Sequence, residues 1–181
     1  MVGLRKATAY SKKKVTPYTR ISKKKGKSYI KTVPQQKIVK FSMGKEKFHR
    51  RGRLPHILTL VSTENVQVRQ NALEACRQYL NKKLDTELKG QYFFRIIPYS
   101  HHVQRENRML TGAGADRMQT GMQLSFGKSM GKSAILKKDT VLFIVAVANQ
   151  KAVSFVRGLY KQIKSKLPGK TKILYEIIKK E

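Results

Sequence analysis

The alternation of apolar and polar residues predicts six short strands. They cover residues 37–43, 56–62, 92–99, 133–138, 141–148 and 172–178. Gly44 ends the first strand, and Pro98 places the end of the third at a sheet edge or a bend. The stretch VLFIVAVA at 141–148 is apolar on both faces, so we expect a central, buried strand there.

Two stretches have the helical period. The first covers residues 64–84, and Thr63 is available as its N-terminal cap. Its apolar stripe consists of Val68, Ala72, Ala75, Cys76, Tyr79 and Leu84, with Lys83 as the polar exception. The second covers residues 152–167 and stops at Pro168-Gly169. This order of elements predicts an α+β fold, with two helices packed on one face of a mostly antiparallel sheet.

The other side of the first predicted helix is polar and basic. It carries Arg69, Gln70, Arg77, Gln78 and Lys82. Such a face is usually a solvated one, but in a strongly basic chain contact with RNA is an equal alternative.

A long stretch without a lasting period lies between the third and fourth strands. Residues 105–132 read RENRMLTGAGADRMQTGMQLSFGKSMGK and hold five of the twelve glycines and four of the six methionines. Loops longer than about 12–15 residues are uncommon in compact domains and are usually functional or disordered. We interpret this one as a functional loop; an insertion without a role is the alternative.

The strongest indication of a partner is the net charge of the chain. The chain has 40 Lys and Arg against 10 Asp and Glu, a formal net charge of +30 over 181 residues. A polyanion would offset the self-repulsion, and nucleic acid is the expected partner because neutralised phosphates release counterions. No run of 18 apolar residues or signal-peptide pattern stands in the sequence, so we expect no membrane partner and no secretion.

The charge is densest at the N-terminus. Residues 1–36 hold eleven Lys or Arg and no acidic residue, with Tyr10, Tyr18 and Tyr29 between them. Tyrosine can stack on bases while cations follow phosphates. We therefore predict a basic, extended arm at 1–36 that binds RNA, followed by a single domain at 37–181; a solvated, disordered tail is the alternative.

Tests for catalytic chemistry give no candidate. Gly127-Lys128-Ser129 and Gly131-Lys132-Ser133 resemble the end of a phosphate-binding loop but lack the earlier glycine. The four histidines form no zinc pattern with Cys76, which falls on an apolar face as a small buried residue would. We expect no enzyme, no cofactor and no metal site.

Several segments together resemble one universal ribosomal protein family, called L-sixteen in bacteria and L-ten-e in archaea and eukaryotes. They are RENRMLTGAGADRMQTGM at 105–122 followed by FGK at 126–128, PYTR at 17–20, KIVKFSMG at 37–44 and VQVRQNALEACR at 66–77. The match runs nearly end to end, and the loop and C-terminus are of archaeal type. The resemblance implies an α/β-hammerhead type of fold with a long loop that is mobile until RNA orders it. It also implies a structural role in the large ribosomal subunit of the cytoplasm.

The resemblance also implies partners. They are large-subunit ribosomal RNA (rRNA), tRNA in the aminoacyl and peptidyl site region near the peptidyl transferase centre, and neighbouring large-subunit proteins, without a homo-oligomer. The residues expected to bind rRNA are Arg5, Tyr10, Tyr18, Arg20, Lys25, Arg69, Arg105, Asn107, Lys128 and Lys132. The residues expected in the tRNA-site loop are Arg108, Met109, Gly112, Gly114, Asp116, Arg117, Gln119 and Gly121. A free-standing RNA chaperone or regulator is the alternative, and an RNA-modifying enzyme is a formal third.

Overall fold

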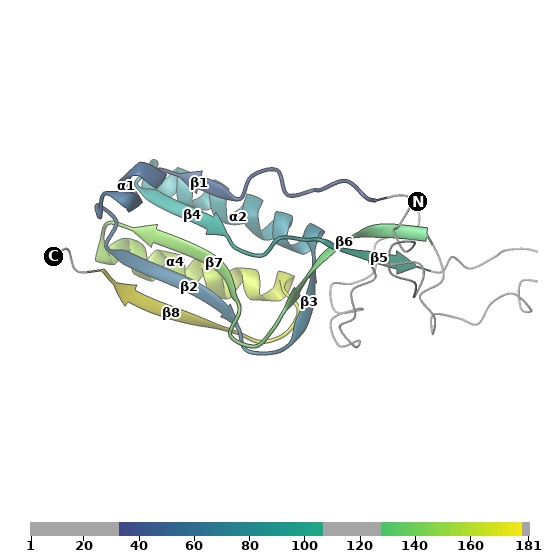
Figure 1. Cartoon of the computed structure of the whole chain (residues 1–181). Coiled ribbons are helices and arrows are strands. Elements are labelled where there is room, and N and C mark those ends of the chain that lie inside the picture. Colours follow the sequence, from purple (N-terminus) through teal and green to yellow (C-terminus); the bar gives the residue numbers. More distant parts are fainter. Residues whose placement is uncertain (1–32, 107–127, 179–181) are drawn as a thin grey trace, which may run out of the picture.

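The structure is a computed structural model that describes residues 33–106 and 128–178. The described residues form two antiparallel sheets with helices packed against them, an α+β arrangement (Figure 1). The larger sheet has five strands in the order β1-β4-β7-β2-β8. These strands are β1 (Ser42–Gly44), β4 (Tyr92–Ile96), β7 (Val141–Val147), β2 (His56–Ser62) and β8 (Thr171–Ile177). The strand expected to be central, β7, lies in the middle of this sheet.

Two long helices cover one face of the larger sheet (Figure 1). They are α2 (Gln70–Leu88) and α4 (Gln150–Ile163), and a 3-10 turn (Lys164–Lys166) continues α4. Leu58, Phe94 and Phe143 from the sheet pack against residues of both helices in one core. Tyr160 of α4 is fully buried there, its hydroxyl donates a hydrogen bond to Leu58 O at 3.1 Å, and burial raises its pKa.

The opposite face of the larger sheet carries a smaller cluster. Leu54, Phe93 and Ala146 are buried together, and Phe48 packs against them from α1 (Glu46–Arg50). Neither a strand nor a helix was predicted from the sequence over residues 45–53, so this short helix was missed. The helix is held in place by Phe48, whose apolar ring anchors an otherwise polar segment to the sheet.

The second sheet has three strands in the order β3-β6-β5. They are β3 (Val66–Arg69), β6 (Lys128–Leu136) and β5 (His102–Glu106). The predicted helix at 64–84 is therefore wrong over its first six residues, because α2 begins at Gln70 and Val66–Arg69 pairs as a strand with residues 133–136 of β6. Thr63 does not cap the helix; its hydroxyl donates instead to Lys170 O at 3.0 Å.

The buried stripe of α2 also differs from the predicted one. Leu73, Cys76, Leu80 and Leu84 are fully buried, whereas Ala75 is exposed. The helix continues one turn beyond the prediction and ends where Lys89 and Gly90 take positive φ angles. Cys76 is buried as expected, and burial raises the pKa of its thiol to about 12.

Other predicted boundaries shift for local reasons. Of the strand predicted at 37–43 only Ser42 and Met43 pair, because the preceding residues follow α2, with Lys37 N donating to the Gln70 side chain at 3.1 Å. β4 stops at Ile96, before buried Pro98. The strand predicted at 133–138 begins five residues earlier, at Lys128.

Candidate nucleic-acid interface

A basic corner, residues 45–53, projects from the sheet face that the long helices leave free. Its five cations are exposed: Lys45, Lys47, Arg50, Arg51 and Arg53. The single acid, Glu46, pairs with Arg50 at 2.7 Å. Five cations against one acid in nine residues make a surface suited to phosphates.

The packing beneath the basic corner holds it in place. The Phe48 ring lies between two of the cations, with Lys45 Nζ 4.8 Å and the Arg53 guanidinium 5.2 Å from its centre. The His49 ring stacks on buried Phe93 with 4.9 Å between ring centres. The cations thus stand on a fixed base, which lowers the entropy lost when they bind. None of them was among the predicted rRNA contacts, although the density of KEKFHRRGR was the available signal.

The predicted functional loop joins two paired strands. Glu106 at the end of β5 is the Cα partner of Lys128 at the start of β6, with a register shift between Gln104 and Arg105. Arg105, Lys128 and Lys132 therefore belong to strands, which corrects the loop boundaries of 105–132. The reason is that each of these segments pairs with the other arm of the hairpin. The hydrophobic period within one segment does not show such pairing. The connecting residues 107–127 lie outside the described residues.

Buried amides bond two strands of this second sheet to each other and fix the segment before β1 to the start of α2. Gln67 Nε2 donates to Ser133 Oγ at 2.7 Å, and both side chains are buried. Gln70 accepts from Lys37 N and donates to Gln35 O at 3.3 Å. Buried amides with satisfied hydrogen bonds resist sliding of the elements they join.

The other predicted contacts divide into two groups. Arg69 is half-buried at the end of β3, so it does not stand on a helical face as predicted. The remaining predicted residues lie outside the described residues: Arg5, Tyr10, Tyr18, Arg20, Lys25, Asn107, Arg108, Met109, Gly112, Gly114, Asp116, Arg117, Gln119 and Gly121.

A row of aromatic rings connects the larger sheet to the root of β5. Phe41 stacks with Tyr99 at 5.6 Å between ring centres, Tyr99 with His101 at 6.4 Å, and His101 lies 4.2 Å from His102. Tyr99 is 52% exposed, and exposed rings are surfaces on which bases can stack. Burial, then the neighbouring His101, lowers the pKa of His102, which favours its neutral form. The segment PYSHH at 98–102, which overlaps the end of the third predicted strand, was the sequence signal for this row.

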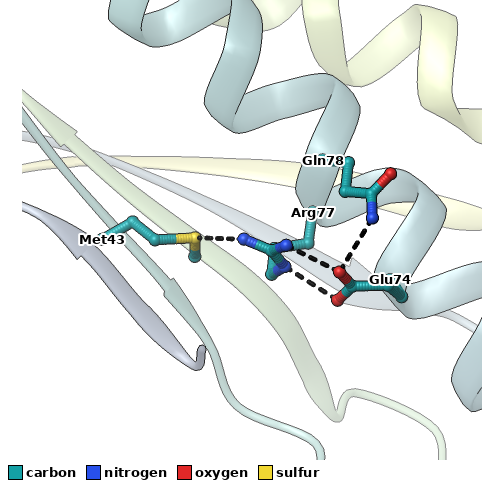
Figure 2. A network of polar contacts seen from close by, with 4 residues as sticks. All are labelled: Met43, Glu74, Arg77 and Gln78. Carbon is teal, nitrogen blue, oxygen red and sulfur yellow. Dashed lines mark hydrogen bonds and ion pairs between the residues drawn. The ribbon is translucent and has the colours of Figure 1, made fainter. Parts of the chain in front are cut away.

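Arg77 is not a free cation for RNA. Its Nε and Nη2 donate to the two Glu74 oxygens at 2.7 and 2.6 Å, and Nη1 lies 3.4 Å from Met43 Sδ (Figure 2). Gln78 Nε2 donates to the same carboxylate at 3.1 Å. This network lines a groove of about 610 Å³ between α2 and residues 39–44. The polar face of α2 is therefore partly a structural one.

The Glu74–Arg77 pair contributes to stability in a pH-dependent way. The hydrogen bonds from Arg77 hold the pKa of Glu74 below its ordinary value. Because the folded pKa is lowered, the stabilisation is present above the ordinary carboxyl pKa and is lost as the pH falls through the folded value. Glu74→Gln should lower the free energy of unfolding by roughly 1–3 kcal/mol at pH 7, since it leaves a largely buried guanidinium without its charge partner. Urea unfolding of the wild type and of Glu74→Gln at pH 7 and near pH 3 measures the difference in their free energies of unfolding, which should be smaller at the lower pH.

A matched control is the exposed pair on α1. Glu46→Gln removes the partner of Arg50, whose side chain is 76% exposed, so its effect should stay below about 1 kcal/mol. Equal effects of the two substitutions would contradict the structural role of the Glu74–Arg77 pair.

Residues 33–106 and 128–178 contain neither a cluster of metal-ligating side chains nor a helix that could span a membrane. No group of three or more His, Cys, Asp or Glu side chains gathers there as a metal site would require. No helix in this part of the chain is both long and apolar enough to span a membrane.

The fold and the basic corner define a small, strongly basic α+β protein with a surface suited to nucleic acid. A family model described as ribosomal protein L16p/L10e matches residues 13–174, and the chain belongs to this family. The family predicted from the sequence segments is thereby confirmed.

Archaeal relatives match over nearly the whole chain, and each is named "Large ribosomal subunit protein uL16". The one from Staphylothermus marinus is 40% identical over 177 residues, which are 97% of this chain and 95% of the relative. The one from Sulfolobus acidocaldarius is 40% identical over 182 residues, 98% and 97% of the two chains. The one from Thermofilum pendens is 36% identical over 174 residues, 96% and 97%.

Proposed function

We propose that this chain is a structural constituent of the large ribosomal subunit in the cytoplasm. The observation that carries the proposal is the match to proteins so named over 97% of this chain. The charge of +30 supports the same role, because a chain of this charge needs a polyanion around it. Its partners are then rRNA and neighbouring ribosomal proteins, and its role is structural rather than catalytic.

The rRNA contact is best supported at the basic corner. Its exposed cations are fixed by the packing of Phe48 and His49, so they can neutralise phosphates without much further ordering. The row of Tyr99 and His101 adds ring surface for unpaired bases. The predicted arm at 1–36, ahead of the single domain predicted at 37–181, would add eleven Lys and Arg to these contacts.

The loop between β5 and β6 is the part that would reach the tRNA sites. The ribbon of β5 and β6 extends away from the five-stranded sheet (Figure 1), which supports a loop held out beyond the core. Arg108 and Arg117 would meet phosphates there, and Gly112, Gly114 and Gly121 would let the backbone approach RNA closely. The catalyst at the peptidyl transferase centre is RNA, so the protein would position tRNA there without taking part in the chemistry.

The experiment that tests the role is sedimentation of the tagged chain in a high-salt sucrose gradient. We expect about one copy per large subunit, retained at a salt concentration that strips peripheral proteins. If salt moves the chain wholly to the light fractions while the subunits stay active, the ribosomal role is wrong and the RNA chaperone takes its place.

Charge variants connect the same experiment to the basic corner. Lys47→Ala, Arg50→Ala and Arg51→Ala together should release the chain at a lower salt concentration, since each lost phosphate contact reduces the salt slope by about one. The control is Lys82→Ala, Lys83→Ala and Lys89→Ala on and after α2, where Asp85 and Glu87 offset the lysines. Equal release of both triple variants would exclude the basic corner as the contact.

A further inference from the structure

β8 leaves one long edge of the larger sheet open. It is the outermost strand, lies along the lower edge of the sheet in Figure 1, and pairs with β2 from Thr171 opposite Ser62 to Ile177 opposite His56. No strand of the described part of the chain covers its other side. The backbone of such an edge is a template for one more strand.

The alternation of hydrogen bonds shows which backbone groups are available. Ile178 N donates to Pro55 O at 2.9 Å, and Thr63 N donates to Lys170 O at 3.0 Å. In an antiparallel ladder the bonded pairs recur at every second residue, so the even-numbered positions of β8 bond to β2. Ile173, Tyr175 and Ile177 therefore direct their N–H and C=O groups toward the open edge.

The side chains along this edge are apolar and exposed. Leu174 is 37%, Ile177 55% and Ile178 51% exposed. Residues 173–178, ILYEII, contain no Lys or Arg although the chain carries 40 of them. Cations border this stretch, because Lys172 precedes it and the Arg157 guanidinium lies 5.2 Å from the centre of the Tyr175 ring. The exposed aliphatic side chains themselves offer no charge to phosphates and no ring to bases, so they are better suited to protein than to RNA.

β8 also lacks most of the features that protect edge strands, although one lysine, Lys172, stands at its second position. Natural edges are shortened, bulged, or interrupted by proline or lysine. β1, the other outer strand, follows this rule with three residues. β8 has seven residues in unbroken register with β2 and no proline. An unprotected apolar edge in a native protein is expected to be covered in its functional assembly.

We propose that an extended segment of a neighbouring large-subunit protein adds to β8 as a sixth strand of this sheet. Its backbone would bond to Ile173, Tyr175 and Ile177, and its alternate apolar side chains would cover Leu174 and Ile178. An acidic residue would face Lys170 and Lys172, where the edge becomes basic. The inference rests on the proposed function, because the particle supplies the neighbouring protein.

Two measurements on purified large subunits test the sixth strand. Hydrogen exchange of residues 171–178 should slow by at least about tenfold between the free chain and the particle, since the open-edge amides become bonded. A photoreactive phenylalanine derivative at position 174 should crosslink to another protein. Unchanged exchange, or a crosslink to RNA or to a second copy of this chain, would overturn the proposal.

Variants check that the edge contributes to incorporation. Leu174→Lys should compete about fivefold less well than the wild type for places in the particle, because a lysine on the edge opposes strand addition. Val39→Lys is the matched control, since Val39 is 74% exposed away from β8, and it should compete normally. Equal competition by both variants and the wild type would count against the sixth strand. Sedimentation distinguishes failure of this inference from failure of the proposed function. If the chain is absent from large subunits, the proposed function is wrong. If the chain is present but β8 is uncovered, only this inference is wrong.

Discussion

Gly44→Ala should lower the free energy of unfolding by about 2–4 kcal/mol, the largest effect expected of a single methyl group in the described fold. Gly44 has φ = +83°, in the left-handed region that favours glycine. An added Cβ would press against the backbone carbonyl oxygen of Tyr92, which accepts a hydrogen bond from Lys45 N at 2.9 Å. Backbone strain and steric overlap therefore act together at the turn that leads from β1 into α1.

Urea unfolding of the full chain at fixed salt measures this loss. The matched control is Gly158→Ala in α4, where the structure places no atom of the described residues within 4 Å of the added Cβ. Because alanine suits a helix better than glycine, this control should raise stability by roughly 0.5–1 kcal/mol. If Gly44→Ala unfolds within about 0.5 kcal/mol of the wild type, the close approach of Gly44 to Tyr92 is wrong.

The elements with the strongest patterns could be predicted from the sequence. His56–Ser62 was predicted residue for residue, β7 within one residue, and α4 within two residues at its start and four at its end. The pattern of each of these segments fits only one type of secondary structure. The two strands are apolar runs too short for a helix, and the helix has an apolar stripe at helical spacing that ends before Pro168-Gly169. Gly44 was also correctly predicted to end a strand.

The remaining elements depend on partners distant in sequence. Val66 and Val68 fit either a strand or the first turn of a helix, and pairing with residues 134 and 136 of β6 decides between them. The ends of the predicted loop became strands for the same reason, because β5 and β6 pair with each other. The second sheet was therefore missed.

The interface was predictable in composition but not in geometry. The excess of Lys and Arg indicated RNA, yet it could not show that Arg77 is held by Glu74 and Met43 while the cations of the basic corner remain exposed. Phe48 explains the difference, since its packing against Phe93 and Leu54 turns a basic segment into a fixed surface. Such packing depends on strands that come 40 or more residues later in the chain.

Removing the loop between β5 and β6 should separate rRNA binding from tRNA-dependent activity. Glu106 and Lys128 are already Cα partners, so an Asn-Gly turn in place of residues 107–127 can close the hairpin without moving either strand. The shortened chain should fold and enter large subunits, because the basic corner and both sheets are intact. Peptide-bond formation with tRNA substrates should fall by about ten- to a hundredfold, since the loop that we propose to position tRNA is missing.

A pair of full-length variants separates charge from shape in the same assay. Arg108→Lys with Arg117→Lys keeps the charge and should retain most activity, whereas Arg108→Ala with Arg117→Ala should lose a large part of it. Sedimentation of each particle confirms that the variant chain is present before its activity is compared. If subunits with the shortened hairpin form peptide bonds at the normal rate, the loop does not serve the tRNA sites. The contribution of the chain would then lie in the rRNA contacts of its arm and basic corner alone.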